Sequence, residues 1–104
     1  AAHSDEIGYL FDLSYEDETP SAADQLVIDQ MTTLWTNFAK FGDPTPETTE
    51  LLPVKWSPIS ENSYTYLSID RELTVATRPY HERMAFWELF FDVNAEKLKG
   101  YQQK

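Results

Sequence analysis

The chain has 104 residues, enough for one small domain, and 41% of them are hydrophobic, as is typical of a globular protein. Its formal net charge of −10 argues against nucleic acid or anionic membrane surfaces as partners, because both bind basic patches. It contains no cysteine, which excludes disulfides and cysteine-based zinc sites within this segment and leaves the redox compartment open.

The chain opens with a loop followed by a short predicted helix. The acidic pair 5–6 precedes the apolar run 7–11. Ser4 or the first acid of the pair can cap this helix, and acidic residues suit the positive end of the helix dipole. Gly8 weakens the helix, so we expect only one or two turns. The polar segment 14–20 is predicted to be a solvated loop and not a metal site, because it lacks the alternating ligands of a calcium loop.

The strongest local pattern predicts a helix at residues 21–41. Ser21 and Asp24 have the spacing of a capping box, and Gly42 followed by Pro44 predicts the C-terminal end. Apolar residues recur along this helix at helical spacing. The members of this stripe are Val27, Met31, Leu34, Trp35, Phe38 and Phe41. Such a wide apolar stripe must be buried against a large core.

The second half of the chain is predicted to contain an irregular segment, a hairpin and a helix. Four of the six prolines lie within residues 43–63, which excludes a regular element there, and Trp56 is interpreted as a packing residue of this segment. Residues 64–69 and 73–77 alternate and are rich in β-formers, so they predict a β-hairpin. A helix is expected at residues 80–91.

A separate short amphipathic tail, 93–99, is expected after that helix and is closed by Gly100. One two-stranded hairpin is not stable alone in water, and it cannot cover two helices with such wide apolar surfaces. We therefore expect that this chain completes a larger sheet and core that it does not contain.

The residues themselves offer few catalytic candidates. His3 lies in a loop, where a lone histidine is more often structural than catalytic, and His81 is interpreted as an exposed or capping residue. No second histidine has ligand spacing to His3, so neither a metal site nor a cofactor is predicted. Asp5 and Glu6 are too close in sequence to face each other across a sugar. No glycine-rich phosphate loop and no G-x-S-x-G motif is present.

Several segments resemble one known family. Residues 1–11 are similar to the catalytic-histidine loop of the type-B carboxylesterase/cholinesterase family of α/β hydrolases, whose pattern is H-G-[DY]-E followed by an apolar run. Residues 34–44 resemble the W-x-N-F-A-[KR]-x-G-[DN]-P helix end of that family. Trp56, residues 66–69 and residues 85–87 follow in the same order and spacing. The resemblance covers nearly the whole chain, and residues 1–11 are most similar to insect carboxylesterases.

The resemblance implies an α/β fold in which residues 1–104 are the C-terminal portion of one α/β-hydrolase domain and not an independent domain. The larger N-terminal part, absent here, would carry the nucleophilic serine, the acidic residue and the oxyanion hole, because the triad order in this family is Ser, then Glu or Asp, then His. His3 would then be the general acid/base of carboxylic ester hydrolysis. Glu6 would belong to a hydrogen-bond network beside the site, with a capping or helix-dipole acid as the alternative.

The expected partners are therefore the N-terminal part of the same enzyme and a small-molecule ester, with no nucleic acid, membrane span or cofactor, and this chain alone would be inactive. A serine carboxylesterase of the insect type leaves xenobiotic esters, hormone-like esters and pheromone acetates open as substrates, with xenobiotic detoxification as one role, in the cytoplasm or after secretion. One alternative is a non-catalytic cholinesterase-like adhesion or binding protein, and another is an independent acidic helical domain with no activity. Three positions depart from cholinesterases or from the family pattern: Ser4 replaces Gly, Asp5 replaces Tyr, and Met84 replaces Cys.

Overall fold

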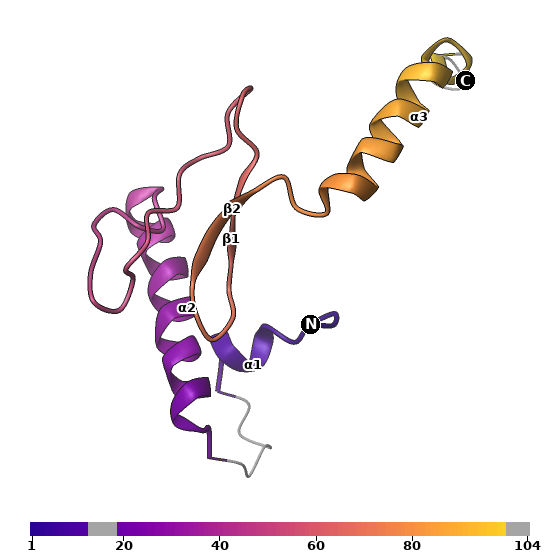
Figure 1. Cartoon of the computed structure of the whole chain (residues 1–104). Helices are drawn as coiled ribbons and strands as arrows, with labels where there is room; N and C mark the ends of the chain where they lie inside the picture. Colours follow the sequence, from indigo (N-terminus) through magenta and orange to yellow (C-terminus); the bar gives the residue numbers. More distant parts are fainter. Residues whose placement is uncertain (13–18, 100–104) are drawn as a thin grey trace.

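The computed structural model describes residues 1–12 and 19–99. Most of the polar loop predicted at 14–20, and Gly100, lie outside these residues. In chain order the elements are helix α1 (Ile7–Leu10), helix α2 (Ala22–Phe41), strands β1 (Thr65–Ser68) and β2 (Thr74–Thr77), and helix α3 (His81–Lys99) (Figure 1). No helix among the described residues has the long apolar stretch needed to cross a membrane.

Helix α2 begins and ends where the sequence predicts. The Ser21 hydroxyl accepts a hydrogen bond from the Asp24 N–H at 3.2 Å, and the Asp24 carboxylate accepts from the Ser21 N–H, which completes the capping box. Gly42 adopts the left-handed conformation, φ 68°, and donates its N–H to the Phe38 carbonyl at 2.8 Å. The caps satisfy main-chain groups that the helix leaves unpaired at both ends.

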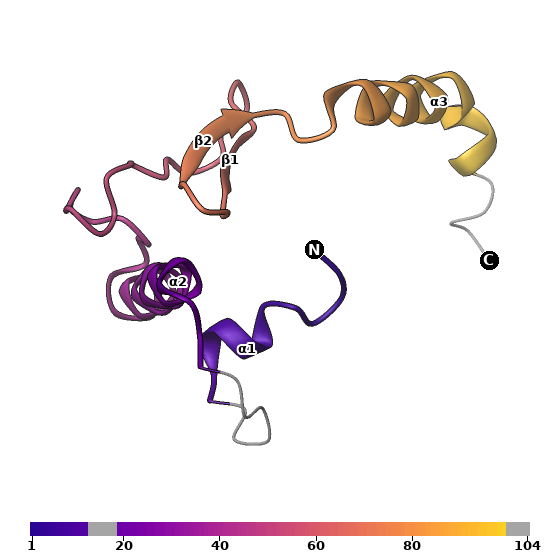
Figure 2. The same cartoon turned by 60° about the horizontal axis from the view of Figure 1, so that its bottom comes forward.

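The hairpin is also confirmed, as a two-stranded antiparallel sheet in which Leu67 pairs with Val75. The core lies where α2, the proline-rich segment and the hairpin meet (Figures 1 and 2). Its members are Leu34, Leu52, Leu67 and Leu73. Trp56 packs against this cluster and is half-buried, as the sequence predicts for a packing residue. Burial of each leucine side chain stabilises the fold by about 1.5–3 kcal/mol, so a core of four leucines is small.

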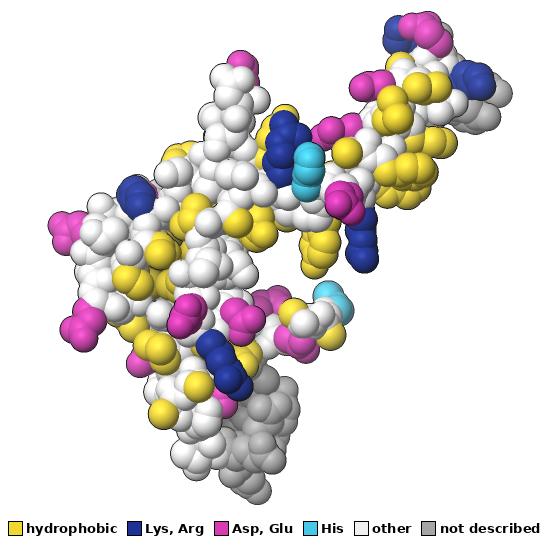
Figure 3. Space-filling model, viewed as in Figure 1, with side chains coloured by type: hydrophobic (Ala, Val, Ile, Leu, Met, Phe, Trp, Pro, Cys, Tyr) yellow, Lys and Arg dark blue, Asp and Glu magenta, His cyan; other side chains and the backbone are white. Residues whose placement is uncertain are grey.

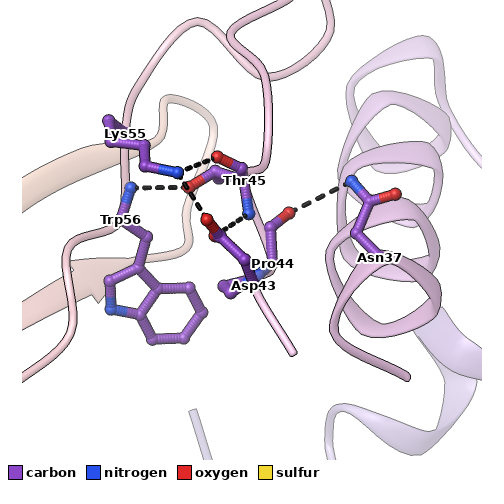
Figure 4. Close-up of polar contacts among 6 residues, drawn as sticks. All are labelled: Asn37, Asp43, Pro44, Thr45, Lys55 and Trp56. Atoms are coloured by element: carbon purple, nitrogen blue, oxygen red, sulfur yellow. Dashed lines mark hydrogen bonds and ion pairs between the residues drawn. The ribbon is translucent and has the colours of Figure 1, made fainter. Parts of the chain in front are cut away.

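A polar network fastens the proline-rich segment to the end of α2 (Figure 4). Lys55 Nζ contacts the Asp43 carboxylate at 2.6 Å and also donates to the Thr45 carbonyl. Thr45 is fully buried; its N–H donates to Asp43 at 2.9 Å, and its hydroxyl accepts the Trp56 N–H at 2.9 Å. Asn37 of α2 donates to the main-chain carbonyl just before Thr45. The segment is irregular, yet its main chain is held at defined points.

Much of the predicted apolar stripe of α2 is not buried by the described chain. Met31 and Leu34 are buried, but Trp35, Phe38 and Phe41 are 44%, 60% and 64% exposed. The small core and the short α1 do not offer enough surface to cover the rest of the stripe. The burial expected from the sequence is therefore only partly reached within this chain.

Helix α3 is longer than predicted. The sequence predicts a helix at 80–91 and a separate tail at 93–99, but α3 runs without a break from His81 to Lys99. No proline or glycine interrupts it, and the Asn94 side chain bonds to the Phe90 carbonyl at 2.7 Å within the helix.

Helix α3 extends away from α2 and the hairpin (Figures 1 and 2), and apolar side chains lie open along it (Figure 3). Its aromatic side chains contact one another and are exposed to solvent. They are Phe86, Trp87, Phe90 and Phe91. The described part of the chain thus leaves these aromatic side chains of α3 without a core that covers them.

Candidate active-site histidine

His3 lies in a four-residue turn that is closed twice by the same residue. The Asp5 N–H donates to the Ala2 carbonyl at 3.3 Å, and the Ala2 N–H donates to the Asp5 carboxylate at 2.5 Å. His3 is one of the two residues between these contacts. The turn therefore presents the histidine from a loop whose ends are tied together.

Ser4, the residue after the histidine, has a left-handed backbone with φ 70°. A positive φ at the third residue of a turn is the mark of a type II turn, where Gly or Asn is usual. An L-residue in this conformation costs roughly 1–2 kcal/mol. The structure therefore places Ser4 in the conformation that glycine adopts freely, and the sequence resemblance puts glycine at this position in the family.

Helix α1 carries the turn and lies against α2. The Ser4 carbonyl accepts the Ile7 N–H at 3.2 Å, which connects the turn directly to the helix. The predicted cap at Ser4 or Asp5 is wrong: the N-cap residue is Glu6, which has a helical backbone and makes no side-chain capping bond. Asp5 is not free to cap, because its carboxylate is held by Ala2 instead.

The predicted site residues are open to solvent. His3 and Glu6 are exposed, and neither side chain makes a hydrogen bond to another described residue. His81 is the first residue of α3 and is exposed, as predicted. Within 1–12 and 19–99 the structure brings together no group of three potential metal ligands. The geometry thus offers an accessible imidazole on a closed turn.

An apolar hollow of about 670 Å³ lies elsewhere, beside the end of α2. Trp35, Phe38, Trp56, Pro58 and Ile59 are among its lining residues, and His3 is not. It is made from the part of the α2 stripe that stays exposed. We therefore interpret the hollow as uncovered packing surface and not as the place where His3 would act.

Comparison with known proteins decides the family. The sequence profile of the carboxylesterase family matches residues 1–87, from the turn of His3 to the middle of α3. The chain belongs to the carboxylesterase family. The family implies an α/β-hydrolase fold, and the helices and two-stranded sheet described above are the part of it seen here.

Several individual proteins are also similar in sequence to this chain. The chain is 32% identical over 99 residues to the bile salt-activated lipase of Rattus norvegicus, covering 89% of this chain and 16% of that protein. It is 31% identical over 104 residues to neuroligin-2 of Homo sapiens, covering 84% of this chain and 12% of that protein. For neuroligin-3 of Macaca mulatta the identity is 30%, covering 85% of this chain and 52% of that protein. The chain thus spans a small part of the lipase and of the human neuroligin.

Two contacts, one at the turn of His3 and one at the end of α2, are not predicted by the sequence. The first is the hydrogen bond from the Ala2 N–H to the Asp5 carboxylate, called the clamp below, in which a side chain reaches back three residues. The contact between Asp43 and Lys55 joins residues twelve positions apart, and no periodic pattern reports it.

Proposed function

We propose that this chain supplies the general acid/base histidine, His3, of a serine carboxylesterase. The observation that carries the proposal is the exposed imidazole on a closed turn at the head of the 87 residues that match the carboxylesterase family. An imidazole suits this role because histidine side chains change charge near neutral pH. The serine and the acidic residue would come from the longer protein.

In this mechanism His3 moves a proton twice in each half-reaction. It takes the proton of the serine hydroxyl as the serine oxygen forms a bond to the ester carbonyl carbon, and it returns that proton to the departing alcohol as the ester bond breaks. It then takes a proton from water as the water attacks the acyl-enzyme and returns it to the serine. The acidic residue would hold the other ring nitrogen. Glu6 is proposed to join the hydrogen-bond network beside His3 once the rest of the domain is present.

We further propose that residues 1–104 are the C-terminal segment of one α/β-hydrolase domain. The exposed aromatic residues of α3 and the uncovered part of the α2 stripe support this, because a soluble monomer rarely exposes large contiguous apolar patches. The small share of the lipase covered by the chain, 16%, supports it as well.

For the substrate, we propose a small non-choline carboxylic ester, with xenobiotic detoxification in an insect-type enzyme as the role. Asp5 and Met84 support this, since the resemblance puts Tyr and Cys at these positions in cholinesterases. The relatives reported above are mammalian and carry no information on this finer assignment. Comparing kcat/KM for a choline ester and a matched alkyl ester tests it; a preference for the choline ester would contradict it.

The replacement His3→Ala in the longer protein tests the proposed role. We expect ester hydrolysis to fall by roughly a thousandfold or more, as for loss of a triad member, with unchanged thermal unfolding. His81→Ala is the matched control and should retain full activity. A fluorophosphonate probe should label the unmodified protein outside residues 1–104. Label on Ser4, or hydrolysis that survives His3→Ala, would contradict the mechanism.

A second candidate function is a non-catalytic adhesion or binding protein, and the matches to neuroligins favour it. His3 does not separate the two candidates, because a protein of this class can keep the histidine loop. The experiment described above separates them. A non-catalytic protein would take no fluorophosphonate label and would hydrolyse no ester, with or without the replacement His3→Ala.

A further inference from the structure

We propose that Asp5 is a positioning residue for His3: its carboxylate accepts the Ala2 N–H and so locks the turn that presents the histidine. This inference rests on the proposed function, since it says what holds the general base in place. It concerns a side chain to which the resemblance gives no role of this kind.

The turn has few other supports. Residues 1–8 are all exposed, so no buried side chain fixes their conformation. The main-chain bond that closes the turn, from Asp5 to Ala2, is 3.3 Å long, at the weak end of the range for N–H···O bonds. The Asp5 side chain adds a second hydrogen bond between the same two residues, because its carboxylate oxygen accepts the Ala2 N–H. The side chain of Asp5 therefore constrains the turn together with this weak main-chain bond.

The backbone of Ser4 makes such a constraint necessary. Its positive φ is unfavourable for a residue other than glycine, so the turn has a tendency to relax. Relaxation would rotate the peptide groups on both sides of His3 and move the imidazole. Because a displacement of about 1 Å in a catalytic group can cost on the order of a hundredfold in rate, holding this turn matters for the reaction.

The neighbouring acid does not offer the same contact. Glu6 makes no side-chain hydrogen bond to a described residue, and its side chain is one methylene longer than that of Asp5. The position of Asp5 in the turn and the length of its side chain both allow its carboxylate to accept the Ala2 N–H. The proposal requires a hydrogen-bond acceptor at this position and not a negative charge, and this difference makes it testable.

The experiment compares Asp5→Ala with Asp5→Asn in the longer enzyme. Asp5→Ala removes the acceptor and should lower kcat by roughly 10–100-fold with KM unchanged, because the base is misplaced while substrate binding is not. Asp5→Asn keeps an oxygen acceptor and should stay within about threefold of the unmodified enzyme. Asp70→Ala is the matched control, since Asp70 also accepts a local main-chain N–H, at 2.8 Å, but in the hairpin turn.

Two outcomes would overturn the proposal. If Asp5→Ala had the kcat of the unmodified enzyme, the clamp would have no part in positioning. If Asp5→Asn lost as much activity as Asp5→Ala, the charge of Asp5 and not its hydrogen bond would be what matters.

A second readout separates this inference from the proposed function. The exchange rate of the Ala2 amide hydrogen, observed after selective ¹⁵N labelling of alanine, shows whether the hydrogen bond from Ala2 to Asp5 is formed. This readout does not depend on whether the protein hydrolyses esters. The Ala2 amide should be protected in the unmodified protein and in Asp5→Asn, and should exchange rapidly in Asp5→Ala. Equal exchange rates of the Ala2 amide in the unmodified protein and in both variants would overturn the proposal. Protection without any ester hydrolysis would leave the clamp in place and contradict the proposed function.

Discussion

The ammonium group of Lys55 lies 2.6 Å from the carboxylate of Asp43, and this contact ties the proline-rich segment to the residue that follows the α2 cap. The two side chains are 48% and 38% exposed, so water screens the pair and its Coulomb attraction is weak. Its importance lies in geometry, because Lys55 also bonds to the carbonyl of the buried Thr45.

The pair predicts a specific pH dependence of stability. The hydrogen bond from Lys55, followed by the one from the Thr45 N–H, lowers the pKa of Asp43 from its ordinary value of 3.8. Because the pKa is lower in the folded chain than in the unfolded chain, the stabilisation is present above the ordinary pKa and is lost as pH falls through the folded value. Lys55→Met should reduce the urea midpoint of the longer protein at neutral pH, and this reduction should become smaller in strong acid, where only the bond from Lys55 to the Thr45 carbonyl is still lost.

A double-mutant comparison checks the assignment of this pH dependence to Asp43. In an Asp43→Asn background, Lys55→Met should cause no pH-dependent change in the urea midpoint, since no carboxylate is left to titrate. A difference between Lys55→Met and its parent that persisted unchanged into strong acid would show that another group is responsible.

Thr45 is predicted to act through its hydroxyl. Thr45→Val keeps the shape of the side chain but removes the acceptor for the Trp56 N–H, which should destabilise the longer protein by about 1–3 kcal/mol. Thr45→Ser keeps the acceptor and loses one buried methyl group, at a cost of about 1 kcal/mol. Hydrogen exchange of the Trp56 amide distinguishes the two: it should be fast with Val and protected with Ser. Protection in the Val variant would contradict the role of the hydroxyl.

The left-handed backbone of Ser4 predicts different effects on stability for two replacements of this residue. Ser4→Gly removes the steric cost but makes the unfolded chain more flexible, so the free energy of unfolding should change by less than about 1 kcal/mol. Ser4→Val adds a β-branched side chain where φ is 70°, and should destabilise the protein by roughly 1–3 kcal/mol. Urea unfolding of the longer protein measures both. Equal stability of the Gly and Val variants would show that this turn relaxes without cost.

The exposed apolar surfaces predict the behaviour of residues 1–104 expressed alone. Phe38 and Phe41 of α2 are 60% and 64% exposed, and four aromatic side chains of α3 are between 44% and 62% exposed. We expect the isolated chain to self-associate, to bind an apolar dye such as ANS, and to lack a cooperative urea transition. A monomeric chain with a sharp cooperative transition would contradict the proposal that it is one segment of a larger domain.

Local chemistry explains why the sequence predicts some elements so well. Ser21, Asp24 and Gly42 fix the ends of α2 through contacts within three or four residues, and such contacts depend little on the rest of the protein. The hairpin follows from alternation, which is also local. The break expected before residue 93 was wrong because a weak helix former such as Asn94 does not stop a helix when its side chain bonds back to the previous turn.

Contacts that join distant residues were not predictable in this way. Gln30 lies within the apolar face of α2, yet it is buried and donates to the Leu51 carbonyl at 3.1 Å. Neither this bond nor the contact of Lys55 with Asp43 leaves a periodic pattern in the sequence. The site itself was proposed from resemblance, because the catalytic partners expected for His3 are not in this sequence and no local pattern marks the histidine.

The small core has a consequence for the order in which the chain becomes structured. All four of its leucines lie between positions 34 and 73, so α2 and the hairpin can meet through closure of loops of modest length. Structure that depends on short sequence separations forms faster than structure that depends on distant pairings. Leu34 and its neighbours therefore define a nucleus that can assemble first, while the amides of α3, which contributes no residue to this core, should gain protection only in a later, slower step.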